Sequence, residues 1–500
     1  MSNVNQVNSA HFIGIGGCGM SSVALIALDQ GMKITGSDLS ESGYTRRVRD
    51  AGATVFIGHD ASQLKVDGEY PDVVVVTSAI PADNPEYREA KRLGIPIWHR
   101  AQMLARLGHG LKTVAICGTH GKTTSSSMVA TILDELGYDP TFVIGGTLNA
   151  YETNARPGKG EYYVVEADES DKSFMYLSPW CVLLTNAEPD HLNHYEDLDE
   201  IYSQFAKFIA MVPEGGHVAV NGSDPRLMEC ARAGHGDIVT YGTDTMSDFW
   251  VSDFKPKNLG STFLLHCPDG RVLEGSIPNN PGIHNVINAS GVVACVSKLG
   301  VDPADALAVI ARFKGVHRRF DIVGVEAGVT VVDDYAHHPT AVAATLKAAR
   351  TTEYPRIHAL FQPHRFSRYK LVTEVMRPTF AHAFDLADEV TFMDVDPSSD
   401  PIIPGVDGQS FLDVVLENPN HPPATYIADR SILPDYMASR SKPGDLIVMM
   451  SCGDITLEGP RILKALREHR DEILARGEAD AAANNANQAE TPETPEKAGE

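Results

Sequence analysis

Two glycine-rich segments of this chain have the composition of phosphate-binding loops. The first is Gly14-Ile15-Gly16-Gly17-Cys18-Gly19, and the second is Gly118-Thr119-His120-Gly121-Lys122-Thr123-Thr124. Each follows a short apolar run, so each is expected to join a strand to a helix, where backbone N–H groups can close on a phosphate. The first loop has no lysine and suits a diphosphate held without reaction. The second adds Lys122 and Thr123, residue types that reach a terminal phosphate and hold Mg²⁺. The chain is therefore expected to hold a nucleotide-tagged substrate at one loop and to use ATP at the other.

Acidic residues follow two further strand candidates in the region of the second loop. Glu166-Ala167-Asp168-Glu169-Ser170-Asp171 comes directly after one apolar run, and Glu188-Pro189-Asp190-His191 ends another. Carboxylates at strand ends beside a phosphate loop are common Mg²⁺ ligands, and Glu166 with His191 could share a second ion. A solvated acidic turn and a hydrogen-bonded structural histidine are the alternatives.

Two segments near the middle of the chain could contact a nucleotide. Asn285 and Asn288 are three residues apart at the start of a predicted helix, so they share a face and could read a purine edge. Helix capping by Asn285 is the structural alternative. Arg319 could stabilise the charge that develops on a transferred phosphate, or it could be only a linker charge.

The last third of the chain contributes two more polar clusters. Asp333-Asp334-Tyr335-Ala336-His337-His338 follows one strand candidate, and its adjacent histidines diverge on regular structure, so they are not expected to chelate one metal. Phe361-Gln362-Pro363-His364-Arg365-Phe366-Ser367-Arg368 follows another. Arg365 and Arg368 are spaced to share a helix face and could grip a carboxylate, although a solvated basic turn would have the same composition.

The order of apolar runs predicts an α/β protein with three domains. A Rossmann-like domain is expected over 1–109, a central P-loop ATPase-type α/β domain over 110–318 and a C-terminal Rossmann-like domain over 319–476. Asp38 lies nineteen residues after Gly19, which is the spacing of the ribose-binding acid in dinucleotide folds. The tail over 477–500 has no large apolar residues and is expected to be disordered.

The bulk composition excludes several classes of function. A net charge of −24 argues against generic binding to nucleic acid or to an anionic membrane. The seven cysteines are scattered without a CxxC pair, which is typical of reduced thiols in a cytoplasmic protein. No signal peptide or long apolar stretch is evident, so the protein is expected to be cytoplasmic, without a nucleic-acid or membrane partner.

The motifs together resemble those of the Mur ligases of peptidoglycan synthesis, from about residue 10 to residue 470. The resemblance rests on seven segments in this order: HFIGIGGCGM, GTHGKTT, EADESD, TNAEPDH, PGIHNVIN, DDYAHHPT and LFQPHR. It implies a cytoplasmic, ATP- and Mg²⁺-dependent ligase, a monomer or homodimer, that joins L-alanine to UDP-N-acetylmuramate through an acyl phosphate. Cys452 departs from the family, whose members usually carry a smaller residue there, and it is expected to alter local packing.

The resemblance also implies a role for each matching residue. Lys122, Arg319 and His364 would be catalytic, and Thr123, Glu166 and His191 would hold Mg²⁺. ATP would be bound by Gly118, Thr119, His120, Gly121, Lys122, Thr123, Thr124, Asn285, Asn288, Arg319 and Asp334. The UDP substrate would be bound by Gly14, Gly16, Gly17, Gly19, Ser37, Asp38, His59, Ser78, His364, Arg365 and Arg368. If the acidic cluster aligns with the family motif three residues differently, Glu169 takes the place of Glu166 as the Mg²⁺ ligand.

Other functions fit parts of this pattern. A recycling ligase that attaches a whole peptide to UDP-N-acetylmuramate shares most of the motifs, so the acceptor is the least constrained part of the prediction. A folate polyglutamylating ligase would leave the first loop without a purpose. An NAD-dependent dehydrogenase explains Gly14–Gly19 and Asp38 but not Lys122. A nucleotide sensor without turnover is the remaining alternative.

Overall fold

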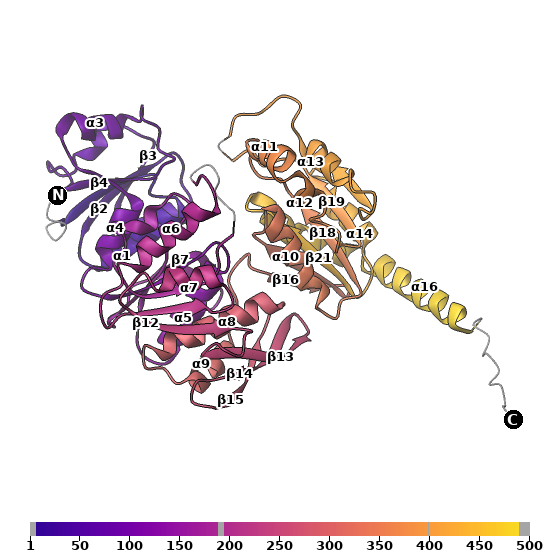
Figure 1. Ribbon diagram of the computed structural model, residues 1–500. Coiled ribbons are helices and arrows are strands. Elements are labelled where there is room, and N and C mark those ends of the chain that lie inside the picture. The colour runs from indigo at the N-terminus through magenta and orange to yellow at the C-terminus, as the bar shows by residue number, and fades with distance from the viewer. Residues whose placement is uncertain (1–6, 189–194, 399, 490–500) are drawn as a thin grey trace. The chain divides into compact units, whose positions relative to one another are not determined.

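The computed structural model describes residues 7–188, 195–398 and 400–489, with three sheets (Figure 1). The chain divides into two compact units. Unit 1 holds the segments 1–255, 262–278 and 283–316, and unit 2 holds the segments 256–261, 279–282 and 317–500. No helix in the described part of the chain is both long enough and apolar enough to cross a membrane.

The first sheet lies in unit 1 and is parallel throughout, in the order β3-β2-β1-β4-β5. Its strands are β1 Ser9–Ile13, β2 Lys33–Asp38, β3 Thr54–Ile57, β4 Val73–Val76 and β5 Ile97–His99. The helices are α1 Cys18–Asp29, α2 Gly43–Asp50, α3 Pro85–Leu93 and α4 Arg100–Leu107. The strand order reverses between β1 and β4, and parallel sheets bind ligands at the carboxyl ends of strands beside such a switch. The first glycine loop leaves β1 at this point.

The second sheet has the order β15-β14-β13-β12-β11-β10-β6-β9-β7-β8. Its strands are β6 Lys112–Cys117, β7 Thr141–Leu148, β8 Thr153–Arg156, β9 Tyr162–Glu166, β10 Pro179–Leu184, β11 His217–Asn221, β12 Asp237–Gly242, β13 Phe249–Lys257, β14 Gly260–His266 and β15 Val272–Ile277. The helices are α5 Lys122–Glu135, α6 Leu198–Ile209, α7 Pro225–Ala231, α8 Ile283–Ser297 and α9 Pro303–Ile310. Strand β6 carries the second glycine loop and lies between β9 and β10, parallel to both.

One continuous apolar core joins the first two sheets. Polar bonds reinforce it: the Tyr163 hydroxyl donates to the Leu104 carbonyl over 3.1 Å, and the Ser22 hydroxyl donates to Asn154 over 2.8 Å. A second core on the other face of the central strands packs α5 against α8. In it the Cys181 and Cys295 sulfurs lie 3.5 Å apart, and all seven cysteines of the chain are free thiols.

The third sheet forms unit 2 and has the order β16-β17-β21-β18-β19-β20. Its strands are β16 Asp321–Glu326, β17 Val329–Asp334, β18 Arg356–Phe361, β19 Glu389–Met393, β20 Ala424–Ile427 and β21 Asp445–Met450, and only β16 is antiparallel to its neighbour. The helices are α10 Pro339–Arg350, α11 Arg368–Lys370, α12 Arg377–Ala381, α13 Gly408–Val415, α14 Leu433–Arg440, α15 Glu458–Glu468 and α16 Arg470–Ala489.

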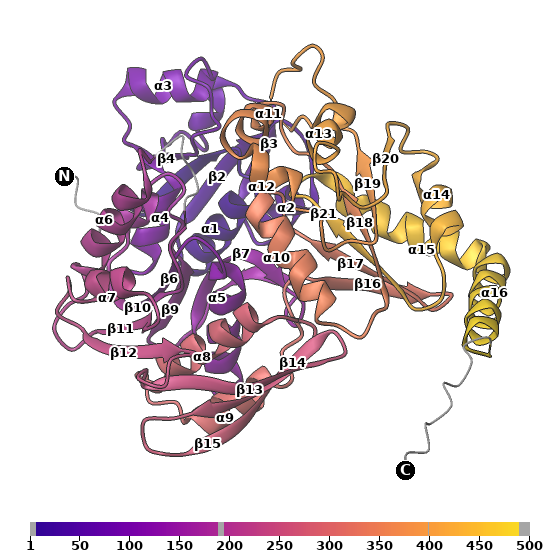
Figure 2. The same ribbon diagram turned by 45° about the vertical axis from the view of Figure 1, so that its right-hand side comes forward.

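Helices cover both faces of this third sheet (Figure 2). One face packs under α10, α12 and α13, where Phe361 lies among Phe380, Phe384 and Phe392. The other face packs under α14 and α15. Alternating strands and helices with helices on both faces confirm the predicted α/β class.

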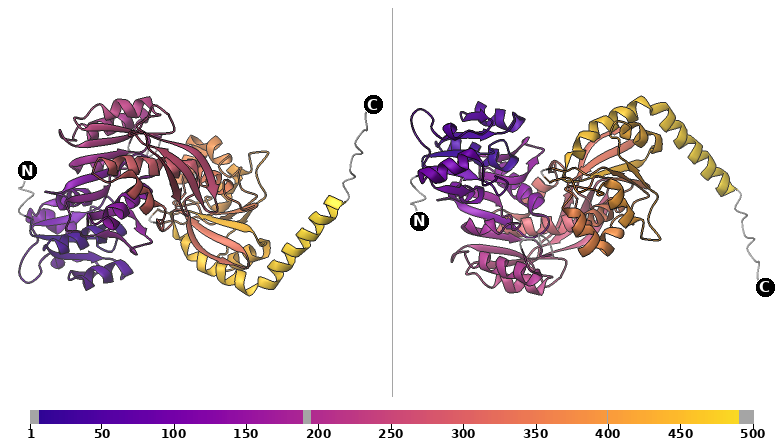
Figure 3. Two further views of the ribbon diagram at one scale, coloured as in Figure 1. Left: turned by 90° about the horizontal axis from the view of Figure 1, so that it is seen from below. Right: turned by 90° about the horizontal axis from the view of Figure 1, so that it is seen from above.

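The tail differs from its prediction over part of its length. Helix α16 continues through Gly477 to Ala489 and extends away from the sheet of unit 2 (Figure 3), so disorder from residue 477 onward is the wrong expectation for 477–489. Alanine is the strongest helix former, and this segment is rich in it. The buried Ile473 anchors the start of the helix in the core beneath α15. Residues 490–500 lie outside the described residues.

Candidate active site

The lysine loop has a backbone that favours glycine at two positions. Gly118 has φ +126° and Gly121 has φ +82°, the left-handed region that side chains disfavour. A methyl group on Gly118 would collide with the Thr185 hydroxyl, and one on Gly121 would lie 2.7 Å from the Asn288 amide. Helix α5 begins at Lys122, so the loop joins strand β6 to a helix N-terminus, as the sequence predicts.

The segment after β10 holds this loop in place. The Thr185 hydroxyl donates to the carbonyl of His120 over 2.7 Å, and the Asn186 side chain bonds both the N–H and the carbonyl of His120, each over 2.9 Å. The His120 ring lies 3.2 Å from the carboxylate of Glu188. Thr185 and Asn186 belong to the TNAEPDH motif, but their task is to shape the neighbouring loop, and sequence spacing alone gives no sign of it.

Lys122 is turned into its own loop and paired with an acid. Its ammonium group donates to the carbonyls of Gly118 and Thr119, over 2.7 Å and 3.0 Å, and lies 2.7 Å from a Glu169 oxygen. Burial alone would lower the pKa of Lys122, but the carboxylates of Glu169 and Glu166 outweigh burial and raise it. The lysine is therefore a fixed positive charge in the loop.

Two of the three predicted metal ligands lie together. The Thr123 hydroxyl donates to Glu166 over 3.0 Å, and the other Glu166 oxygen accepts the N–H of Gly145 over 2.9 Å. A hydroxyl and a carboxylate at the start of a phosphate-binding helix are the hard oxygen donors that Mg²⁺ prefers, so this pair fits the ion. Within the described ranges no three acidic, histidine or cysteine side chains cluster as a complete metal site, so remaining ligands would come from nucleotide and water. His191 lies outside the described residues.

Helix α8, which packs against α5, carries both predicted asparagines and brings Asn288 against this loop. Asn285 and Asn288 are 9% and 8% exposed, and the Asn288 amide lies directly against Gly121. Because α8 begins at Ile283, Asn285 lies inside the helix and is not its N-cap. Thr119 and Thr124 are buried in the same loop and helix start.

The first glycine loop is closed by the end of β2. The N–H groups of Gly14 and Ile15 donate to the Ser37 carbonyl over 2.8 Å and 2.9 Å, and the Gly16 N–H donates to Asp38 over 2.8 Å. The predicted ribose-binding acid therefore also orders the loop. Helix α1 begins at Cys18, so Gly17 is its N-cap and Gly19 lies in its first turn.

Three further residues predicted at this site occupy different environments. Ser37 is fully buried, the His59 side chain is 15% exposed, and the His59 ring lies 2.9 Å from the Ser37 hydroxyl. Ser78 is exposed in the loop after β4. Ser37 lies at the carboxyl end of β2, and His59 and Ser78 follow the carboxyl ends of β3 and β4.

In unit 2 a group of positive charges surrounds Tyr335. The guanidinium groups of Arg318 and Arg319 lie 5.1 Å and 4.9 Å from the centre of the Tyr335 ring. Arg318 also contacts the buried Asp333 over 3.3 Å and donates to the Ser451 carbonyl over 2.6 Å. Burial raises the pKa of Asp333, an effect that Arg318 opposes.

Asp334, predicted to bind the nucleotide, already accepts three protein hydrogen bonds. These come from the N–H groups of Phe320 and Ala336, over 2.8 Å and 2.9 Å, and from the Thr345 hydroxyl over 3.0 Å. Its carboxylate thus ties the segment that carries Arg319 to the loop before α10 and to the middle of that helix.

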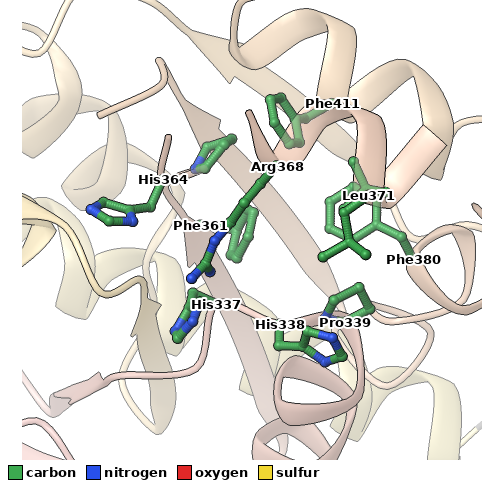
Figure 4. Close-up of a pocket in the computed structure, with 11 residues that line it drawn as sticks. His337, His338, Pro339, Phe361, His364, Arg368, Leu371, Phe380 and Phe411 are labelled. Carbon is green, nitrogen blue, oxygen red and sulfur yellow. The ribbon is translucent and has the colours of Figure 1, made fainter. Parts of the chain in front are cut away.

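A small cavity of about 10 Å³, room for roughly one water molecule, lies at the carboxyl end of β18. His337, His338, His364 and Arg368 supply its polar lining, and Phe361, Phe380 and Phe411 lie on its apolar side (Figure 4). The guanidinium end of Arg368 points toward the side where His337 lies. Burial lowers the pKa of His364, so its ring is neutral at pH 7 and can accept a proton.

The expectation that Arg365 and Arg368 share a helix face is wrong. Arg365 has φ +67°, which no helix contains, and α11 begins only at Arg368. The Arg365 N–H instead donates to the Asp396 carbonyl over 2.8 Å, which turns the chain before the helix. Cys452 is half-buried in the loop after β21, where burial raises its pKa.

Comparisons with known proteins cover nearly the whole chain. The models named Mur ligase family, catalytic domain; Mur ligase middle domain; and Mur ligase, glutamate ligase domain match residues 9–110, 116–296 and 318–453. The UDP-N-acetylmuramate–L-alanine ligases of Geotalea uraniireducens and Rubrobacter xylanophilus are each 40% identical to this chain. The matches cover 92% and 91% of this chain and 99% of each relative.

Two solved structures are similar over the same span. The UDP-N-acetylmuramate-alanine ligase of Thermotoga maritima superposes with a TM-score of 0.74 at 30% identity, over 92% of this chain and 99% of its own. A murein peptide ligase from Psychrobacter arcticus superposes with a TM-score of 0.67 at 26% identity, over 92% of this chain and 98% of its own.

Proposed function

The chain belongs to the Mur ligase family, and we propose that it is an ATP-dependent ligase that joins L-alanine to the carboxylate of UDP-N-acetylmuramate. The reaction forms an amide bond and releases ADP and phosphate, as a step of peptidoglycan precursor synthesis. The observation that carries the proposal is its full-length likeness, at 40% identity, to relatives named for this reaction.

The chemistry explains why such an enzyme needs a nucleotide loop as well as a substrate loop. A carboxylate is a poor electrophile, because amine attack would have to expel an oxide. Transfer of the γ-phosphoryl group of ATP to the carboxylate gives an acyl phosphate, which has phosphate as a leaving group. The alanine amine then attacks the carbonyl carbon, and the tetrahedral oxyanion collapses with loss of phosphate.

The geometry of the lysine loop supports ATP as the co-substrate. Lys122 has a raised pKa and lies beside left-handed glycines whose backbone leaves no space for side chains. In the proposal it shifts from Glu169 toward the β- and γ-phosphates, while the N–H groups at the start of α5 meet the phosphates and Asn285 and Asn288 meet the base. Arg319 and Asp334, from the C-terminal domain, would contact the same ATP. The proposed domain bounds are 1–109, 110–318 and 319–476.

Mg²⁺ would be held by Thr123 and Glu166, with His191 as a further ligand. When bound, the ion neutralises phosphate charge during transfer. The protein's own contribution is to hold the Thr123 hydroxyl and the Glu166 carboxylate 3.0 Å apart at the helix start.

The first glycine loop and the ends of β2 and β4 would hold the UDP part of the substrate. Gly14, Gly16, Gly17 and Gly19 would approach the diphosphate, and Asp38, Ser37, His59 and Ser78 would surround the uridine. His364, Arg365 and Arg368 would orient the reacting carboxylate. The neutral ring of His364 suits a base that takes a proton from the alanine ammonium group.

The second candidate is the ligase that attaches a whole peptide. The likeness to the Psychrobacter arcticus murein peptide ligase, at 26% identity, favours it less than the 40% identity of the alanine-adding relatives.

Phosphate release from ATP decides among these functions. The reaction is run with UDP-N-acetylmuramate and Mg²⁺, and L-alanine or a tripeptide, as the whole-peptide acceptor, is added in turn. Stimulation by alanine is the expected result. Stimulation by tripeptide alone would select the peptide ligase, and no stimulation by either would overturn the ligase proposal.

A further inference from the structure

A buried carboxylate near the first glycine loop has no role in the chemistry described so far. Glu86 lies in the first turn of α3 and is completely inaccessible to solvent. Burying a charge is costly unless donors surround it, and no lysine or arginine in the described ranges contacts this carboxylate. Its partners are instead a hydroxyl, a backbone N–H, a glutamine amide and two histidines.

Each oxygen of Glu86 is bonded to different elements of unit 1. One oxygen accepts the Ser37 hydroxyl over 2.6 Å and lies 3.2 Å from Nε2 of the buried His11 on β1. The other oxygen accepts the Asp60 N–H over 3.2 Å and lies 3.3 Å from Nδ1 of His59. The Gln63 amide, oriented with its nitrogen toward Glu86, adds a donor at 2.9 Å. The hydrogen bonds of His11 and Ser37 outweigh burial, so the pKa of Glu86 is lowered and the group is ionised.

Ser37 connects this carboxylate to the glycine loop. Its hydroxyl donates to Glu86, while its carbonyl accepts the N–H groups of Gly14 and Ile15. The next residue, Asp38, accepts the N–H of Gly16. The end of β2 therefore holds the glycine loop through the Ser37 carbonyl and the Asp38 side chain, and holds Glu86 through the Ser37 hydroxyl.

The network fixes the orientation of the His59 ring. Since the Ser37 proton goes to Glu86, the Ser37 oxygen is free to accept the Nδ1–H of His59 over 2.9 Å. When the ring carries a single proton, these bonds place that proton on Nδ1, and Nε2 is then an acceptor. The side chain is 15% exposed, and no group in the described part of the chain is bonded to Nε2.

We propose that Glu86 is a positioning residue for the UDP site: it holds His59 so that Nε2 accepts a hydrogen bond from the uridine. The donor is an N–H or O–H group of the nucleoside, either the imide of the uracil or a ribose hydroxyl. Glu86 does not touch the substrate, and it acts through His59 and Ser37. The inference rests on the proposed UDP-substrate function of this loop.

The test measures UDP binding to the full chain by calorimetry, which needs no turnover. Glu86→Gln keeps the shape and removes the charge, and it is expected to weaken UDP about tenfold, as is His59→Ala. In the His59→Ala background, Glu86→Gln should add little, because the ring on which Glu86 acts is gone. Glu89→Gln, which removes the ion-pair partner of Arg92 on the same helix, is the matched control and should bind UDP like the unmodified chain.

Kinetics supply the second readout. Glu86→Gln should raise KM for UDP-N-acetylmuramate about tenfold while kcat and KM for ATP stay unchanged, a split that general damage to the fold would not give. Should Glu86→Gln fail to fold, Ser37→Ala replaces it and removes the hydroxyl that joins Glu86 to the ring. Binding of 3-methyl-UDP and 2′-deoxy-UDP distinguishes the two donors, because the analogue that lacks the donor should lose its sensitivity to His59→Ala.

The outcomes separate the two proposals. If the unmodified chain does not bind UDP, the UDP-site function is wrong. If it binds UDP but Glu86→Gln binds equally well, or if the effects of Glu86→Gln and His59→Ala add in full, the positioning role is wrong and the function is untouched.

Discussion

The ammonium group of Lys122 lies 2.7 Å from the carboxylate of Glu169, which is only 2% exposed. A buried acid of this kind strongly favours a cation, and the lysine bonds the carbonyls of its own loop at the same time. The pair keeps the lysine charged and ordered before a nucleotide arrives. In the proposed reaction, phosphate oxygens compete with Glu169 for the same ammonium group.

Replacing this lysine should abolish turnover and spare the other loop. For Lys122→Ala we expect ATP-dependent phosphate release to fall at least about a hundredfold, because the charge that meets the transferred phosphoryl group is lost. UDP binding, measured by calorimetry, should stay unchanged. Lys159→Ala, an exposed lysine of the same unit, is the control for charge. Loss of UDP binding in a folded Lys122→Ala chain would contradict the division into two sites.

The pair of Thr123 and Glu166 predicts a change in metal dependence. Thr123→Val removes the hydroxyl but keeps the shape, so the Mg²⁺ concentration for half-maximal activity should rise about tenfold. Thr123→Ser keeps the hydroxyl and should restore most of the affinity. A titration with Mg²⁺ at saturating ATP measures both. An unchanged Mg²⁺ requirement in the valine variant would remove Thr123 from the metal site.

The contacts that hold the lysine loop in place predict that two glycine-to-alanine substitutions differ widely in their cost to the free energy of unfolding. Gly118→Ala combines a left-handed backbone with a collision against Thr185, so it should cost about 2–5 kcal/mol in the free energy of unfolding. Gly137→Ala has φ +84° but open space around it, and it should cost only about 1–2 kcal/mol. Urea unfolding measures both variants. Equal costs would mean that the loop can move away from Thr185.

Because His358 is buried, we expect acid to lower the stability of unit 2. Burial lowers its pKa from 6.5 to about 4, and its Nε2 lies 2.8 Å from the Thr391 hydroxyl. Below pH 6.5 the unfolded chain binds a proton that the folded chain does not, so stability falls as the pH decreases and levels off near pH 4.

For His358→Gln we expect the loss of stability between pH 7 and pH 5 to be smaller by about 2 kcal/mol than in the unmodified chain. Urea unfolding at both pH values provides the measurement. His382→Gln, at an exposed histidine, should keep the full pH dependence. The explanation fails if His358→Gln loses as much stability on acidification as the unmodified chain.

The sequence predicts strands better than it predicts side-chain partners. Strands end where the sequence predicts them before its polar segments: β1 and β6 precede the glycine loops, and β9 and β18 end at Glu166 and Phe361. The agreement arises because strands buried on both faces are continuous apolar segments bounded by polar residues. Helix α16 was missed because alanine and polar residues can form a helix without a wide apolar face.

Contacts between distant segments explain most of what the sequence could not predict. Glu86 and Ser37 are 49 residues apart in the sequence, and Glu166 and Thr123 are 43 residues apart. The second pair was predicted because both residues belong to motifs with a known chemistry. Glu86 belongs to no such motif, and only the parallel order of β1, β2 and β4 brings α3 to the end of β2.

The seven thiols differ in exposure, so their rates of chemical labelling report when the core of the protein opens. Cys18 is exposed and should react with a thiol reagent at once, whereas Cys181 and Cys295, between β10 and α8, can react only when that core opens. Since α8 carries Asn285 and Asn288, a nucleotide that binds these residues should slow the late phase of labelling. The native cysteines would then record nucleotide binding without any introduced label.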